Sequence, residues 1–221
     1  MSSLSIRSFT LFREEQPVRD ALVLFTLTLL LHFLGAMLRL VQELSFFWPL
    51  NAVMAGIFAR YVWLNRSYFY AVCFAAMLVY DGLTSRWGMG FASLLINFSN
   101  IVFIVTLTQF AQQVRQLVGE QGMVARIGGE EFAVAAVVDS AQQGYLLAEK
   151  IRHGVESQPF GLGQNPIHLT ISLGLETREV GHARITELFN QLLLAADDEM
   201  VKAKQSGRNQ ICMPTLTESA P

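Results

Sequence analysis

The sequence predicts two parts, an all-α membrane bundle of about four spans and a smaller α+β domain. Hydrophobic residues make up 52% of the 221 residues and charged residues only 15%, whereas ordinary soluble domains have about 25% charged residues. This apolar excess is confined to the first half of the chain. The second half combines a Gly-Gly turn between two short apolar runs with two amphipathic helical patterns, which indicates a mixed α+β domain.

Four apolar runs in the first half predict membrane spans. Each is close to the roughly 20 residues that cross the hydrocarbon core of a bilayer. Pro49 and Asn51 make the second run the weakest of the four. No small-residue cleavage site precedes the first run, so we expect it to stay as an anchor instead of being removed as a signal peptide. The spans are placed at about residues 20–38, 46–63, 68–85 and 91–109.

The distribution of arginine predicts the orientation of these spans. Six arginines lie before the first span, between the second and third, or after the fourth, whereas the alternate loops hold only Arg39 and Arg86. Because basic residues stay preferentially on the cytoplasmic side, both termini are expected in the cytoplasm. The six cytoplasmic arginines are Arg7, Arg13, Arg19, Arg60, Arg66 and Arg115.

Polar residues inside the spans have two interpretations. Four polar residues are costly at membrane depth without partners, and such residues often mark a ligand or ion site: Asp81, Asn51, Asn97 and Asn100. Alternatively, Asp81 is close enough to a span end to reach water, and Asn51, Asn97 and Asn100 form hydrogen bonds between helices. We interpret His32 as a packed or interhelical-bonded histidine instead of a metal ligand.

Charge in the second half argues against nucleic acid as a partner. Residues 119–221 hold eight basic and thirteen acidic residues, a net charge of −5. Binding of nucleic acid needs a basic footprint, which this part lacks. Cys73 lies in a span and Cys212 near the tail, so no disulfide is expected and the compartment is predicted to be reducing.

The heptapeptide RIGGEEF at residues 126–132 is the most informative part of the chain. Gly128 and Gly129 can supply the positive φ angles of a tight primed turn and leave space for a ligand beside the backbone. The adjacent carboxylates of Glu130 and Glu131 favour a divalent cation held together with phosphate oxygens, and magnesium suits such hard oxygen ligands. A solvated hairpin with two surface glutamates is the alternative.

This segment resembles the signature of the GGDEF family, the diguanylate cyclases, in its GGEEF form. A second motif, AADDEMVKAKQSGRN at residues 195–209, is similar to the family's last helix and exit turn. Residues 147–156 fit the middle helix of the family, and residues 168–176 fit the strand after it. The resemblance implies the later part of a ferredoxin-like, palm-type nucleotide-cyclase domain. It also implies synthesis of cyclic di-GMP from two GTP molecules at the bacterial cytoplasmic (inner) membrane.

The resemblance assigns roles residue by residue. Glu130 and Glu131 match the catalytic, metal-binding positions, with Mg²⁺ as the implied cofactor. Basic residues at the end of the last helix match the pair that contacts phosphates, although charge that complements the helix dipole is the alternative. The matched substrate-binding residues are Gly128, Gly129, Lys204 and Arg208.

Two family segments have no counterpart in this chain. The family's domain starts with a D-x-LTG-L-x-NRR segment and a strand carrying D-x-D-x-FK-x-x-ND, and both precede the hairpin. Here the chain passes from Gly119 to Met123 straight into the hairpin strand. The missing strand carries the aspartate that completes the metal pair and much of the guanine pocket, so impaired synthesis is expected. Gly119 and Gly122 occupy the positions of the inhibitory R-x-x-D motif, so feedback inhibition by that route is not expected.

The predicted organisation is a membrane domain at residues 1–109, a connecting helix at 110–122 and a truncated GGDEF domain at 123–221. The connecting helix has apolar residues at helical spacing, Phe110, Val114 and Leu117. The resemblance implies a homodimer in which this helix pairs with its copy, and an amphipathic helix lying on the membrane surface is the alternative. Strands are expected near 123–127, 132–138, 167–176 and 209–213, and helices at 140–157 and 184–205.

Three classes of function follow. The first is a membrane-anchored diguanylate cyclase that is impaired in this chain. The second is a non-catalytic membrane sensor, or a regulatory or remnant GGDEF protein. The third is a small four-span membrane protein whose role lies in its spans. GTP, membrane lipid and a second copy of the chain are the expected partners, and nucleic acid is not.

Overall fold

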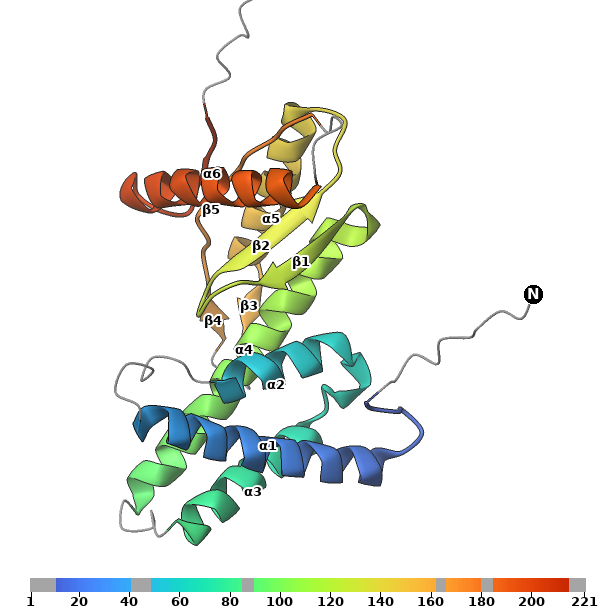
Figure 1. Ribbon diagram of the computed structural model, residues 1–221, viewed down its shortest axis with the longest axis vertical. Coiled ribbons are helices and arrows are strands. Elements are labelled where there is room, and N and C mark those ends of the chain that lie inside the picture. Colours follow the sequence, from blue (N-terminus) through green and yellow to red (C-terminus); the bar gives the residue numbers. More distant parts are fainter. Residues whose placement is uncertain (1–10, 41–48, 85–89, 162–165, 180–184, 215–221) are drawn as a thin grey trace, which may run out of the picture. The chain divides into compact units, whose positions relative to one another are not determined.

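The chain forms two compact units, residues 1–108 and 109–221 (Figure 1). The computed structural model describes residues 11–40, 49–84, 90–161, 166–179 and 185–214.

The first unit is helical. It comprises α1 (Pro17–Leu40), α2 (Pro49–Arg60), the short 3-10 helix η2 (Val62–Leu64), α3 (Ser67–Leu83) and the first part of α4 (Phe91–Val118).

Two of these helices, α1 and α4, are long and apolar enough to cross a membrane. The candidate membrane spans are Pro17–Leu38 and Phe91–Gln121. The helix α3 is apolar but shorter, with 17 residues. The helix α2 has 12 residues, which is about 18 Å at 1.5 Å per residue and less than the roughly 30 Å of a hydrocarbon core. Residues 46–48 of the predicted second span lie outside the described residues. The four predicted spans are therefore not confirmed, and two candidates stand.

Buried apolar side chains hold the first unit together. Leu24 of α1, Phe58 of α2, Met77 of α3 and Ile104 of α4 belong to one core cluster. Other large apolar side chains are exposed on α1 and α4, as expected for surfaces that face lipid. The exposed ones include Val18, Leu22, Leu30, Phe33, Leu94, Ile96 and Phe98.

Hydrogen bonds between helices involve Asp81 and three asparagines of the first unit. Asn51 Nδ2 donates to Asn100 Oδ1 at 3.0 Å, which joins α2 to α4. Asp81 is buried, and its Oδ2 accepts from Asn97 Nδ2 at 2.6 Å and from the Ser93 hydroxyl. The interpretation of the asparagines as interhelical partners is confirmed. The expectation that Asp81 reaches water is wrong, because its side chain is buried against α4.

The second unit begins with the end of α4 and the 3-10 turn η4 (Gly119–Gln121). It continues with β1 (Gly122–Arg126), β2 (Phe132–Ala136), α5 (Ala141–Ser157), β3 (Pro159–Phe160), β4 (Ile167–His168), β5 (Leu173–Gly174), α6 (Ile185–Gln205) and β6 (Ile211–Cys212).

The strands form three two-stranded sheets. The pairs β1–β2 and β3–β4 are antiparallel, and β5–β6 is parallel. The strand predicted at 167–176 is present only as the short β4 and β5. A strand needs a hydrogen-bonded neighbour, and no strand pairs with residues 169–172 in the described part of the chain. The single sheet of a ferredoxin-like fold is therefore not confirmed.

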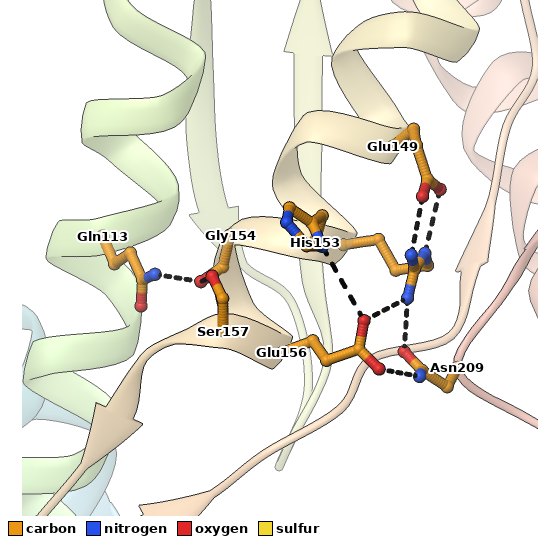
Figure 2. Close-up of polar contacts among 8 residues, drawn as sticks. Gln113, Glu149, His153, Gly154, Glu156, Ser157 and Asn209 are labelled. Carbon is orange, nitrogen blue, oxygen red and sulfur yellow. Dashed lines mark hydrogen bonds and ion pairs between the residues drawn. The ribbon is translucent and has the colours of Figure 1, made fainter.

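The C-terminal part of α4 belongs to the core of the second unit. Val114 and Val118 are buried in one cluster with Ile151, Val155 and Phe160. Two glutamines of α4 bind backbone groups near the end of α5 and directly after β3. Gln109 Oε1 accepts from Gly161 N at 2.7 Å. Gln113 Nε2 donates to Gly154 O at 2.5 Å, as Figure 2 shows.

Residues 110–118 form the end of α4, and the pairing of this helix with its copy stays a prediction. Phe110 and Leu117 pack against the same cluster as Val114, so the apolar face contacts α5 and the strands of its own chain. The periodicity predicts a buried face correctly. It does not say which partner covers that face.

Candidate functional site

The site begins at the loop between β1 and β2, residues 127–131. The Ile127 and Gly128 amides both donate to Glu131 O, at 2.9 and 3.3 Å. The Arg126 guanidinium donates to Gly129 O, at 3.2 Å from Nε and also from Nη2. These bonds close the loop across the end of the hairpin.

The predicted two-residue primed turn is wrong. Neither Gly128 nor Gly129 has a positive φ angle. The loop spans residues 127–131, and two amides converge on one carbonyl, so the backbone reverses without a left-handed residue.

Space, not φ, explains Gly128, whereas neither requires a glycine at Gly129. A Cβ at Gly128 would lie 2.6 Å from Glu131 Oε2 and 3.3 Å from Glu131 Cβ. A Cβ at Gly129 would meet no heavy atom within 4 Å. Gly128 therefore lets the Glu131 carboxylate fold back over the loop, and Gly129 leaves open space beside the backbone.

The structure brings Glu131, at the end of the loop before β2, together with Lys204 of α6. Their Oε1 and Nζ atoms are 3.9 Å apart, and the two side chains are 46% and 41% exposed. At this exposure the ion pair is screened by water and contributes little to stability. Glu130 and Arg208 are exposed and make no ion pair within the described residues.

The carboxylates at the hairpin do not form a complete metal site. Among the described residues, no three His, Cys, Asp or Glu side chains gather closely enough to hold a metal ion. Glu130 and Glu131 are both exposed, and Glu131 already faces a lysine. A site for two magnesium ions needs further hard oxygen ligands. The residues present therefore do not fit a preformed two-magnesium site.

The exit turn after α6 is fixed by a cluster that the sequence did not reveal. Arg152 binds Glu149 through two hydrogen bonds, Nε to Oε2 at 2.9 Å and Nη2 to Oε1 at 2.6 Å. Its Nη1 donates to Glu156 Oε2 at 2.8 Å and to Asn209 Oδ1 at 2.9 Å. Asn209 Nδ2 donates to Glu156 Oε1 at 2.7 Å (Figure 2).

These bonds favour the charged forms of the cluster. Hydrogen bonds from Arg152 lower the pKa of Glu149 below its usual value. Hydrogen bonds from Asn209 and then Arg152 lower the pKa of Glu156. The spacing of Glu149, Arg152 and Glu156 along one face of a helix was the signal in the sequence, but it gives no sign of Asn209.

Comparison with known proteins gives a family for this part of the chain. Residues 105–210 match the family model described as "Diguanylate cyclase, GGDEF domain". The match begins inside α4 and includes the hairpin, α5, α6 and the exit turn.

About half of the chain is also similar to proteins with curated descriptions, two of which are described as probable diguanylate cyclases. The chain is 58% identical over 102 residues to a "Probable diguanylate cyclase DgcF" of Escherichia coli O157:H7, which is 46% of this chain and 21% of that protein. The chain is 43% identical over 104 residues to the "Probable diguanylate cyclase DgcF" of Escherichia coli K12. That match covers 47% of this chain and 33% of that protein. The chain is 36% identical over 107 residues to an "Uncharacterized membrane protein" of Staphylococcus haemolyticus, 48% of this chain and 29% of that protein. The matched segments thus cover a third or less of these relatives' length.

Proposed function

Because residues 105–210 belong to the GGDEF domain family, we propose that the chain is a membrane-anchored, diguanylate cyclase-like protein. We propose that its own synthesis of cyclic di-GMP from two GTP molecules is impaired. One observation carries this proposal. The signature hairpin presents Glu130 and Glu131 beside Lys204, but no third acidic side chain joins them within the described residues.

The residues of the hairpin and the α6 end support binding of nucleotide phosphates. Gly129 leaves space beside the loop backbone, and Lys204 and Arg208 offer positive charge four residues apart at one helix end. In the family, Mg²⁺ polarises the reacting phosphate. With Glu130 and Glu131 as the only acidic ligands of the hairpin, we propose that phosphates bind and synthesis does not follow.

We expect the full chain to bind GTP and ATP with similar affinity. The resemblance attributes most of the guanine pocket to the missing strand, so the phosphates supply most of the contacts. Lys204→Ala and Arg208→Ala should each weaken binding of both nucleotides about tenfold, since a charge-assisted hydrogen bond contributes roughly 1.5–3 kcal/mol. Equilibrium titration of the detergent-solubilised chain measures this. Arg178→Ala, which removes the exposed ion-pair partner of Glu176, is the control. Strong preference for GTP would contradict the account.

We further propose that the chain is a multi-pass protein of the bacterial inner membrane with its C-terminal unit in the cytoplasm. Two long apolar helices and the descriptions of several relatives as membrane proteins support a membrane location. Membrane lipid and a second copy of the chain are its proposed partners. Since Val114 and Val118 are buried in their own chain, any contact with a second copy uses another surface.

Reporter fusions after Arg66 and Arg115 test the topology. Four spans predict a cytoplasmic signal at both positions, because an even number of spans precedes each. If only α1 and α4 cross the membrane, Arg66 lies on the far side and Arg115 stays cytoplasmic. A periplasmic signal at Arg66 would therefore reject the four-span arrangement, and one at Arg115 would reject a cytoplasmic C-terminal unit.

A non-catalytic membrane sensor or regulatory protein is the second candidate. The buried carboxylate of Asp81, bound by Ser93 and Asn97, favours it, because ionisable groups inside a membrane bundle are often functional. The nucleotide titration separates the two candidates. Binding that depends on Lys204 supports the first, and no binding of either nucleotide supports the second.

A further inference from the structure

We infer that Arg152 and Glu156 are positioning residues that act through Asn209 to hold Arg208 ready for a nucleotide phosphate. The inference rests on the proposed function, in which Arg208 contacts phosphates. It concerns three residues that lie outside the hairpin and that have no role in the proposed chemistry itself.

The backbone of the exit turn is unusual. Gly207, Arg208 and Asn209 have φ angles of +114°, +63° and +47°. Glycine adopts such angles readily, but two successive non-glycine residues in the left-handed region are rare and unfavourable. A conformation of this kind persists only when surrounding contacts determine it.

The side chain of Asn209 supplies such contacts. Its Oδ1 accepts from Arg152 Nη1 at 2.9 Å, and its Nδ2 donates to Glu156 Oε1 at 2.7 Å. Arg152 is itself held by Glu149 and Glu156 and is only 15% exposed. Both ends of the amide are therefore bound to side chains of α5, as Figure 2 shows for Asn209 and Glu156. We call these three side chains, Arg152, Glu156 and Asn209, the exit-turn clasp.

Backbone bonds fix the chain on both sides of Arg208. Arg208 N donates to Ala203 O at 3.0 Å, which is the closing bond of a Schellman turn with Gly207 at its left-handed position. Gln210 Nε2 donates to the same carbonyl at 3.0 Å, and Gln210 O accepts from Leu173 N at 3.0 Å. Since the backbone is fixed on both sides of Arg208, the exit-turn clasp determines the conformation of the turn at Arg208.

Arg208 is the residue that this turn presents. It is exposed, and its guanidinium makes no hydrogen bond or ion pair with any described residue. Lys204, one helical turn earlier, is paired with Glu131 of the hairpin. A guanidinium left free beside such a helix end is suited to bidentate binding of a phosphate. The clasp therefore orders a turn whose only uncommitted cationic group is that of Arg208.

A double-mutant cycle on GTP binding tests the inference with the detergent-solubilised full chain. We expect Asn209→Ala to weaken GTP binding about tenfold, as Arg208→Ala does. We expect the double variant to bind no more weakly than either single variant, because both remove one contact. Thermal unfolding of each variant is followed in parallel. Arg178→Ala, which removes an exposed guanidinium paired with the mostly buried Glu176, is the matched control and should leave binding unchanged.

An exchange of the amide and the carboxylate provides the rescue. Asn209→Asp places two carboxylates against each other and should weaken GTP binding. Adding Glu156→Gln restores a donor toward residue 209 and an acceptor for Arg152, so the double variant should recover affinity to within about twofold of the wild-type chain. If the exit-turn clasp acted in folding alone, the double variant would recover the unfolding temperature. The effects of Asn209 and Arg208 on GTP affinity would then not be coupled.

Each outcome decides the inference. Additive losses in the cycle, or GTP affinity unchanged in Asn209→Ala while Arg208→Ala weakens it, would overturn the positioning role and leave the proposed function intact. If the wild-type chain does not bind GTP at all, the proposed function fails, and the positioning role fails with it.

Discussion

Gly174→Ala is expected to unfold the C-terminal unit. A Cβ at Gly174 would lie 1.8 Å from Ala196 O and 2.4 Å from Met200 N. Both are backbone atoms of α6 and cannot rotate away, so β5 would have to separate from the helix that it packs against. Overpacking a core costs about 1–3 kcal/mol even when side chains can adjust, and more when the backbone has to move. Small domains have only about 5–15 kcal/mol of stability.

Thermal unfolding of the C-terminal unit, followed by circular dichroism and limited proteolysis, measures this effect. Gly129→Ala is the matched control, because its Cβ meets nothing within 4 Å and its φ angle is not left-handed. That control should stay within about 0.5 kcal/mol of the wild-type chain, as surface substitutions usually do. Equal unfolding temperatures for the two variants would refute the close approach of β5 to α6.

A fragment that begins at residue 123 is expected to be molten, whereas one that begins at residue 109 should unfold cooperatively. The shorter fragment lacks Val114 and Val118, which are buried in the core cluster. It also lacks Gln109 and Gln113, which bind backbone groups at the end of α5 and after it. Burying one valine stabilises a fold by roughly 1.5–3 kcal/mol, so the loss is a large part of the stability of a small domain.

Dye binding and the sharpness of the thermal transition distinguish the two fragments, since a molten state binds hydrophobic dyes and lacks a sharp transition. Val114→Asp with Val118→Asp in the longer fragment should reproduce the behaviour of the shorter one. A sharp transition in the fragment that begins at residue 123 would show that the core closes without α4.

The family resemblance, together with local patterns in the sequence, predicted most of the secondary structure of the second unit. The helices expected at 140–157 and 184–205 are α5 (Ala141–Ser157) and α6 (Ile185–Gln205). Amphipathic periodicity fixes such elements locally, and Ser140 caps α5 by accepting from Gln143 N at 3.2 Å. The strand at 167–176 was not predictable in this way, because a strand depends on a partner that the pattern does not name.

The sequence predicted the site residues that belong to a family motif. It did not predict contacts between residues that are far apart in the sequence. The hairpin and α6 motifs each supplied one member of the Glu131–Lys204 pair. The bond between Arg152 and Asn209 joins residues 57 positions apart, and no local pattern encodes such a contact. The loop at residues 127–131 was also not predictable, since Gly128 and Gly129 suit both a primed turn and the longer loop that forms.

Turnover tests the central claim most directly. The detergent-solubilised chain is incubated with GTP and magnesium, and cyclic di-GMP is quantified beside a Glu131→Ala variant. The account predicts little or no product, at the level of that variant, because losing a metal ligand removes about 4 kcal/mol of transition-state stabilisation, roughly a thousandfold in rate. Robust cyclic di-GMP formation that disappears on Glu131→Ala would contradict it, since the hairpin carboxylates would then be part of a complete active site.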